Sequence, residues 1–325
     1  MSSETPQLPD YDQFSKADRK SPPLKGLRHF GQFLIVWVFL RLAMLLPVRL
    51  AQKTGSLLGA LLFPLIRRDR TIIEHQISRV FPEMTEKERT RFAKTCYRNM
   101  GVSLFEVLLI PRIRKKATDW IQFQNETALR EAYQEGKGVI LVTGHMANWE
   151  LFSIVFEMLR IPARAIVRSI FNQQLNNLLL NHRKSDFLQA IQRGSKDSPR
   201  QLLNCLRNGD VLVVALDQDT DVPGVFVDFF GLKANTPRIA ANLALKMGVP
   251  LMTGFDQRLE DGRHCFHFNR LPLEEGIENN EENQILLTQR LSDAMEAHIR
   301  KFPEQWAWNH RRWKRRPPDE TASPA

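Results

Sequence analysis

A chain of 325 residues, of which 43% are hydrophobic, is long enough to bury the core of one large α/β domain or of two smaller ones, which excludes a disordered protein. Its formal net charge of +10 and its pI of about 9.7 favour an anionic partner, which could be nucleic acid, a lipid head-group surface or an acidic protein. The three cysteines are far apart and form no CxxC pair, so the sequence indicates neither a disulfide framework nor a zinc site and fits a reducing, cytoplasm-facing environment.

The first 70 residues predict a tail followed by a membrane segment. Residues 1–24 are mostly polar and contain four prolines, which is typical of a disordered tail and unlike a signal peptide. Residues 30–66 are largely apolar without an acidic side chain, but their densest run, 33–40, is shorter than the roughly 20 residues that cross a bilayer. Arginines follow at once and favour the cytoplasmic side. We therefore expect a membrane-associated helical segment over 25–70, which spans the bilayer or lies in its interface; a buried core helix is the alternative.

The next region predicts helices. Residues 70–109 follow a helical pattern broken near Pro82, after which Thr85-Glu86-Lys87-Glu88 resembles a helix start with an acidic first turn. We expect 71–120 to be the helical part of an α/β domain over 71–316, and 317–325 to be a second disordered tail.

From Gly138 onward, short apolar runs alternate with helical patterns. Alternation of this kind predicts an α/β fold with a mostly parallel central sheet and helices on both of its faces. The predicted strands are 138–143, 163–168, 187–192, 210–216, 249–256 and 263–270, and the predicted helices are 147–160, 172–186, 198–207, 236–247 and 280–301.

The segment Gly144-His145-Met146-Ala147-Asn148-Trp149-Glu150 follows the first of these strands and carries a histidine and an acid five positions apart. The spacing alone is weak evidence. Acidic residues make up 36 of the 325 positions, so eight histidines are expected to give about one such pair by chance. On one helix the two side chains would point about 140° apart. If His145 lies in the turn and Glu150 in the helix after it, the carboxylate can hold the imidazole as an oriented general base. The alternative is a turn histidine held by a helix carboxylate without catalysis.

A second polar cluster, Asp217-Gln218-Asp219, follows the strand 210–216. Parallel strands place their ligand sites beyond their carboxyl ends, so this cluster and His145 are expected to share one cleft. Loop acids that pair with neighbouring arginines are the alternative.

Other motifs exclude some chemistry. The chain has no HExxH, no histidine pair four positions apart and no EF-hand series, so we expect no metal, and it has neither a P-loop, a GxGxxG after a strand nor a GxSxG elbow. Half of the six tryptophans lie in 306–313, interleaved with arginine. This pattern suits a membrane interface or single-stranded nucleic acid, and tryptophans packed under the sheet are the third interpretation.

Several dense segments, taken together and in this order, resemble the lipid A biosynthesis (lauroyl/myristoyl-type) acyltransferases of the lysophospholipid acyltransferase superfamily. The chain departs from the family pattern at Met146 and Ala147, where an aromatic residue and a glycine are usual, and at Arg238, where a glycine is common. The segments that carry the resemblance are Val80-Phe81-Pro82-Glu83, Gly144-His145 with Asn148-Trp149-Glu150, Asp217-Gln218-Asp219, 224–231, and Pro303-Glu304-Gln305-Trp306 with Trp308, His310, Arg311, Arg312, Trp313 and Lys314.

The resemblance implies transfer of a fatty acyl chain from acyl carrier protein to a hydroxyl of a lipid A precursor glycolipid, at the cytoplasmic face of the inner membrane. It implies a catalytic dyad in which His145 deprotonates the hydroxyl and Glu150 orients the ring. A thioester donor is already activated, so no metal or cofactor is expected. The acidic carrier protein and the phosphates of the glycolipid fit the basic charge. Further residues expected to bind substrate or to assist are Arg183, Asp217, Asn148 and Asp219.

Two other functions stay open from the sequence. The acceptor could be another glycolipid or a lysophospholipid, because the dyad does not encode it. The chain could also be a basic nucleic-acid-binding protein that uses its C-terminal Trp/Arg segment, although the resemblance implies no nucleic acid partner.

Overall fold

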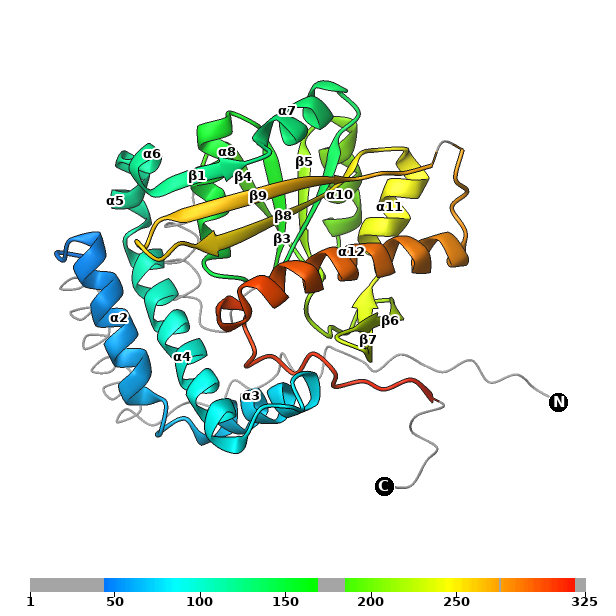
Figure 1. Cartoon of the computed structure of the whole chain (residues 1–325). Helices are drawn as coiled ribbons and strands as arrows, with labels where there is room; N and C mark the ends of the chain where they lie inside the picture. Colours follow the sequence, from blue (N-terminus) through cyan, green and yellow to red (C-terminus); the bar gives the residue numbers. More distant parts are fainter. Residues whose placement is uncertain (1–43, 169–184, 275, 319–325) are drawn as a thin grey trace, which may run out of the picture. The chain divides into compact units, whose positions relative to one another are not determined.

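A seven-stranded sheet forms the centre of the computed structural model, which describes residues 44–168, 185–274 and 276–318 (Figure 1). The strands are β1 (Ile121–Gln124), β2 (Val139–Thr143), β3 (Ala163–Val167), β4 (Leu188–Gln192), β5 (Val211–Ala215), β8 (Leu251–Arg258) and β9 (His264–Leu271), in the order β1-β9-β8-β2-β5-β3-β4. Five neighbouring strands, from β8 to β4, run parallel, whereas β9 is antiparallel to β8 and carries β1 alongside it. The expected α/β fold with a mostly parallel sheet is confirmed.

Helices cover both faces of this sheet. They are α7 (Glu126–Gln134), α8 (Phe152–Leu159), α10 (Ser198–Arg207), α11 (Ile239–Met247) and α12 (Glu281–Lys301). All five residues of β2 are buried, as expected for a parallel strand whose β-branched side chains pack on two faces. Ile140 and Val142 belong to a core that they share with α10, α11 and α12. On the opposite face Phe152 of α8 packs against Phe266 of β9, with ring centroids 5.0 Å apart.

A group of helices precedes the sheet, as predicted for 71–120. These helices are α2 (Val48–Leu62), α3 (Arg67–Val80), α4 (Glu86–Leu108), α5 (Ile110–Lys115) and α6 (Ala117–Trp120). The break near Pro82 is confirmed, and α4 begins with a capping box in which the Thr85 side chain accepts from Glu88 N and the Glu88 carboxylate accepts from Thr85 N. Helices α2 and α4 approach closely because both carry glycine at their contact: a Cβ at Gly55 would lie 2.5 Å from the Gly101 oxygen.

Helix α2 is the described part of the expected membrane segment. One of its faces is buried against α4, whereas Leu57 and Leu61 on the other are 60% and 59% exposed. No helix within the described ranges is both long and apolar enough to cross a bilayer. The apolar residues 30–43 and the predicted tail 1–24 lie outside the described residues, as does most of the tail 317–325.

Two predicted elements differ from the structure, and a third lies almost entirely outside the described residues. The helix expected over 147–160 begins with a 3₁₀ turn, η2 (Trp149–Leu151), before α8, and the helix expected over 172–186 falls almost entirely outside the described residues. The helix expected from 236 starts at 239, because the chain before it forms the antiparallel hairpin of β6 (Gly224–Phe229) and β7 (Leu232–Pro237).

The residues of this hairpin carry a strand signal of their own. Val225, Val227 and Phe229 are buried in alternation along β6, as in a strand with one face on the core. The two connecting residues, Phe230 and Gly231, have φ of 56° and 71°, which matches the two-residue turn with positive φ that joins twisted hairpins. A phenylalanine in the first of these positions hides the turn from a search for Asn-Gly or Asp-Gly.

Candidate active site

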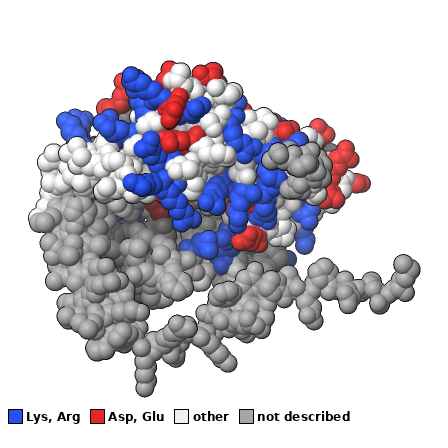
Figure 2. Space-filling view, turned by 90° about the horizontal axis from the view of Figure 1, so that it is seen from below, with Lys and Arg blue, Asp and Glu red and all other residues white. Residues whose placement is uncertain are grey.

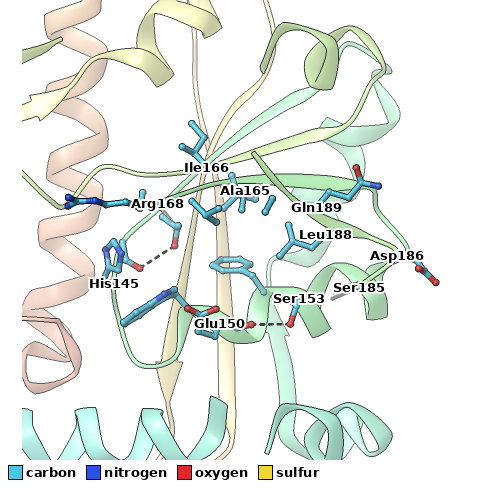
Figure 3. A pocket seen from close by; sticks show the side chains of 18 residues that line it. His145, Glu150, Ser153, Ala165, Ile166, Arg168, Ser185, Asp186, Leu188 and Gln189 are labelled. Carbon is cyan, nitrogen blue, oxygen red and sulfur yellow. Dashed lines mark hydrogen bonds between the residues drawn. The ribbon is translucent and has the colours of Figure 1, made fainter. Parts of the chain in front are cut away.

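Three functional side chains follow the ends of three neighbouring parallel strands. His145 comes after β2, Asp217 after β5 and Arg168 after β3, and the strand order β2-β5-β3 places all three at the same edge of the sheet. This is the edge at which open α/β sheets bind ligands. Figure 3 shows His145, Glu150 and Arg168 around a cavity at this edge. The two polar clusters meet as expected, because Asp217 contacts His145 and Gln218 lines a cavity together with it.

Asp217 holds the imidazole of His145. Its Oδ1 lies 2.8 Å from His145 Nδ1, and its Oδ2 accepts hydrogen bonds from the His145 backbone N (2.6 Å) and from Trp306 Nε1 (2.9 Å). Gly144 permits this approach, because a Cβ there would lie 3.2 Å from Asp217 Oδ2. An ionised carboxylate only accepts, so the proton of the neutral ring is on Nδ1 and the lone pair is on Nε2. The pair is therefore arranged as a general base and its orienting acid.

The charges of the pair stabilise each other. Burial lowers the pKa of His145, but the charge and hydrogen bond of Asp217, with a contribution from Glu150, outweigh it and hold that pKa above its usual value. Burial raises the pKa of Asp217, and the interactions with His145 outweigh this as well, so that pKa lies well below its usual range. Asp217 is 2% exposed and remains ionised at neutral pH. The site therefore favours an imidazolium once His145 has accepted a proton.

Glu150 lies in the 3₁₀ turn η2 and lines the same cavities as His145. Glu150 is the residue expected to orient the ring, but Asp217 occupies Nδ1, the atom through which an orienting acid acts. What Glu150 supplies to His145 is negative charge that raises its pKa. The residue expected only to assist is thus the one in direct contact with the base.

The other predicted residues have different surroundings. Asn148 is buried beneath the turn, where its N–H donates to Asp256 (2.9 Å) and its side-chain amide donates to Glu106 (3.0 Å). Asp219 pairs with Arg315, with Oδ1 2.6 Å from Nε, which is the arginine-paired loop acid given as the alternative. Arg183 lies outside the described residues. The cation that the structure does place in the cavity with His145 is Arg168.

A network of buried charged residues is hydrogen-bonded to Asn148, in the turn that follows β2. Glu106 of α4 accepts two hydrogen bonds from Arg258, at 2.9 and 2.7 Å, and His264 lies between Glu106 (3.2 Å) and Asp256 (2.8 Å). Burial raises the pKa of Glu106, but Arg258 and His264 outweigh it and hold that pKa well below its usual range. Burial lowers the pKa of His264, and the two carboxylates outweigh this and raise it to about 9. Because Asn148 bonds both acids of this network, the network fixes the end of the catalytic turn.

The C-terminal segment, residues 303–314, is hydrogen-bonded to the other side of the turn. The Gln305 carbonyl accepts from Ala147 N (2.8 Å), and the His145 carbonyl accepts from Ala307 N (3.0 Å). Ala147 has a φ of 43°, a conformation that glycine adopts without strain, which gives a physical reason for the glycine that the resembling family has at this position. Contacts on two sides hold this strained residue, because Ser103 of α4 also donates to the Ala147 carbonyl (2.6 Å).

The tryptophans of this segment are core residues. Trp306, Trp308 and Trp313 are 2%, 0% and 6% exposed, and Trp306 packs edge-on against Trp308 with centroids 4.6 Å apart. Of the three interpretations of the Trp/Arg pattern, packing under the sheet is confirmed; the membrane-interface and nucleic-acid interpretations are wrong for these indoles. Their burial against the turn makes this segment part of the site.

His145 stands between two cavities. One, of about 650 Å³, runs along the ends of β3 and β4 and has an apolar wall that includes Ala165, Ile166 and Leu188. The other, of about 520 Å³, lies between α4 and the C-terminal segment and is lined by polar residues such as Asn99 and Asn309. In the part of the chain that the structure describes, no group of three or more His, Cys, Asp or Glu side chains is arranged to hold a metal ion.

Sequence reasoning missed Arg168 and the Glu106 network. Arg168 ends the predicted strand 163–168, so the rule that brings His145 and Asp217 together applies to it as well. For Glu106 the signal is a lone acid in the apolar run from Leu104 to Ile110, because an unpaired charge would not be buried there.

Comparison with known proteins gives relatives over most of the chain. It is 24% identical over 295 residues to the lipid A biosynthesis palmitoleoyltransferase of Escherichia coli, covering 89% of this chain and 91% of that protein. It is 25% identical over 290 residues to the lipid A biosynthesis lauroyltransferase of the same organism, covering 87% and 90%. A phosphatidylinositol mannoside acyltransferase of Mycobacterium tuberculosis is 22% identical over 190 residues, or 57% of each chain. A family model matches residues 18–315, and the chain therefore belongs to the bacterial lipid A biosynthesis acyltransferases.

Proposed function

We propose that this protein transfers a fatty acyl chain from acyl carrier protein to a hydroxyl of a lipid A precursor, with His145 as general base. The observation that carries the proposal is the contact of Asp217 with His145 Nδ1 at the edge of the sheet, where His145 lines two cavities. Membership of the family supports acyl transfer to a lipid A precursor. Acyl carrier protein as the acyl donor and the role of His145 as general base are proposed beyond family membership.

In the proposed reaction His145 Nε2 takes the proton of the acceptor hydroxyl as its oxygen attacks the thioester carbonyl. The tetrahedral intermediate then collapses, the carbon–sulfur bond breaks, and the thiolate of the donor takes the proton back from His145. An ester and a free thiol result, so atoms and charge balance. Asp217 and Glu150 stabilise the transient imidazolium, because both already raise the pKa of His145.

Arg168 is our proposed partner for the negative charge that forms on the carbonyl oxygen. It lines the same cavity as His145 and lies on the same side of it (Figure 3), at the end of the strand β3. A guanidinium close to a developing oxyanion stabilises the transition state more than the neutral thioester, which is how such a group accelerates acyl transfer. The role given to Arg183 by the resemblance stays a prediction.

The two cavities suggest how the substrates divide. The cavity along β3 and β4 has the larger apolar wall, which suits an acyl chain that has to leave water. The cavity beside α4 carries carboxamide groups, which suit the hydroxyls of a sugar. His145 lines both and would therefore stand between the thioester and the attacking oxygen.

We also propose that the protein works on the cytoplasmic face of the inner membrane. The exposed leucines of α2 and the net positive charge of the chain support this, since an apolar helix face followed by arginines binds an anionic lipid surface. Flotation of the full-length chain with vesicles of anionic phospholipid tests it: Leu57→Gln with Leu61→Gln is expected to weaken binding, and unchanged binding would remove α2 from the membrane contact.

The decisive experiment measures acyl transfer by the purified full-length protein, with a panel of acyl carrier protein thioesters and a lipid A precursor as acceptor. His145→Ala is expected to lower turnover by about 10²- to 10⁴-fold, the usual contribution of a general base, in protein that remains folded at the assay temperature. The matched control is His267→Ala, because the His267 ring bonds Gln257 and does not line the cavities. Near-normal turnover by His145→Ala would refute the proposed base, and transfer to a lysophospholipid or another glycolipid in preference would refute the acceptor.

A further inference from the structure

A third cavity, of about 500 Å³, lies outside the site described so far, between α3 and the C-terminal segment. We propose that this basic pocket binds a phosphate group of the glycolipid acceptor; the inference rests on the proposed function. Its walls are basic on both sides. From α3 they include Arg68, His75 and Arg79, and from the C-terminal segment they include Arg311, Trp313 and Lys314.

The pocket is built from one helix face and one fixed stretch of chain. Arg68, His75 and Arg79 are seven and four positions apart, so they share a face of α3. Gln76 ties the opposite wall to the helix, since its amide donates to the carbonyls of Trp308 (2.6 Å) and His310 (2.8 Å) and its oxygen accepts from a third backbone group, Arg312 N (2.8 Å). The cations of the two walls are therefore held facing one space.

The lining of the pocket carries an excess of positive charge. None of the residues that line it is acidic, and Arg68, Arg311 and Lys314 form no ion pair among the residues that the structure describes. The neighbouring Arg70, by contrast, pairs with Glu74 at 2.9 Å. Figure 2 shows Lys and Arg outnumbering acidic residues over the described part of the face that is seen from below. Cations that converge without acids form a site for a compact anion.

An unsatisfied donor lies in the same wall. Trp313 lines the pocket and is 6% exposed, and its buried indole N–H has no hydrogen-bond acceptor within the described part of the chain. A buried donor without a partner is uncommon and costs stability, so an anion whose oxygens reached this N–H would gain a hydrogen bond. Phosphate supplies several such oxygens together with negative charge, and guanidinium groups match its geometry.

The pocket is next to the active site along one segment. His310 lines the cavity beside α4 that His145 also lines, and the following residue, Arg311, lines the basic pocket. A substrate that places a hydroxyl at His145 and a phosphate at Arg311 would be oriented by two fixed points. Binding energy gained away from the reacting atoms would then position the hydroxyl.

The test uses a double variant of the pocket that combines Arg68→Gln and Lys314→Gln. Its control is a second double variant, Lys94→Gln and Lys246→Gln, which removes the same charge from exposed residues elsewhere. Both are assayed with a phosphorylated acceptor and with its dephosphorylated analogue at saturating donor. We expect the pocket variant to raise KM for the phosphorylated acceptor about tenfold or more, to change kcat little, and to lose the preference over the analogue. The control should keep that preference.

Three outcomes would overturn the proposal. A rise in KM for the acyl carrier protein thioester instead of the acceptor would assign the pocket to the phosphodiester of the donor. Inorganic phosphate that stabilises the wild type but not the variant, with an unchanged acceptor KM, would assign it to free phosphate. Equal changes in acceptor KM in the pocket variant and the control would show that the total charge of the protein, and not this pocket, attracts the acceptor.

Equilibrium binding of the acceptor without donor separates this test from the test of the proposed function. Wild-type binding that depends on the phosphate, without any acyl transfer, would refute the reaction and keep the pocket. Acyl transfer at equal rates to both forms of the acceptor would keep the reaction and refute the pocket.

Discussion

Replacing Asp217 by Asn changes one oxygen of a buried side chain and is expected to invert the tautomer of His145. Oδ2 of Asp217 accepts from two donors, His145 N and Trp306 Nε1, whereas among the described residues Oδ1 accepts only from the ring. The carboxamide introduced by Asp217→Asn has a single oxygen, which will satisfy the two donors, so its NH₂ turns to the ring. His145 Nδ1 must then accept, its proton moves to Nε2, and the lone pair needed by the acceptor hydroxyl is lost.

The size of the effect follows from this geometry. A ring held in the wrong tautomer reaches the reactive form only rarely, and in a serine protease the comparable Asp→Asn change lowers kcat by about 10⁴-fold. We expect a loss of about 10² to 10⁴ in kcat for Asp217→Asn, with a smaller change in KM. The pKa of His145 should fall as well, because the charge of Asp217 raises it and burial lowers it. The acidic limb of the pH–rate profile, where the base becomes protonated, therefore moves to lower pH.

Two measurements check this. Steady-state acyl transfer from about pH 5 to about pH 9 gives kcat and the position of the limb, and nitrogen NMR of the labelled ring reports which nitrogen carries the proton. Asp219→Asn is the matched control, since Asp219 bonds Arg315 and not the ring. If Asp217→Asn kept near-normal kcat, with the limb and the tautomer unmoved, Asp217 would not orient the base and Glu150 would regain that role.

Three further predictions concern the framework of the site. Glu106→Ala leaves the buried Arg258 without its carboxylate and should lower the free energy of unfolding, measured by urea denaturation, by about 3 to 5 kcal/mol. The control, Glu282→Ala at an exposed position, should change it little. The pKa of His264 is raised from 6.5 to about 9, so its stabilising contribution is full below pH 6.5 and is lost as pH rises through 9. The difference in unfolding free energy between wild type and His264→Gln should shrink by roughly 3 kcal/mol over that interval, and a constant difference would contradict a charged His264. Gly101→Ala puts a Cβ 2.1 Å from the Gly55 oxygen and should separate α2 from α4, lowering the unfolding temperature more than Lys53→Ala on the exposed face of α2 does.

The sequence predicted which strand ends meet, because that depends on local patterns. The apolar runs 138–143 and 210–216 are each followed at once by polar residues, and parallel strands bring such residues to one edge. The hairpin of β6 and β7 was missed because its turn carries Phe230 where the usual signal is Asn or Asp.

Which acid contacts His145 could not be read from the spacing. Five positions separate His145 from Glu150, and 72 separate it from Asp217, yet the nearer acid in sequence is not the one on Nδ1. The outcome depends on the path of the turn, which includes a positive φ at Ala147 held by the Gln305 carbonyl. Contacts over such separations are set by tertiary packing, to which a local pattern is blind.

The C-terminal segment shows how one stretch of chain can couple the parts of this site. Trp306 donates to the acid that orients the base, and Ala307 donates to the carbonyl of His145 itself. A few residues further on, Arg311 and Lys314 line the basic pocket. A phosphate that draws those cations together would act on a segment already bonded to the catalytic turn, so occupancy of the pocket and the geometry of His145 are expected to be linked. Such linkage is reciprocal, and a variant that frees the turn, such as Asp217→Ala, which removes the acceptor of His145 N and Trp306 Nε1, should also weaken acceptor binding when no donor is present.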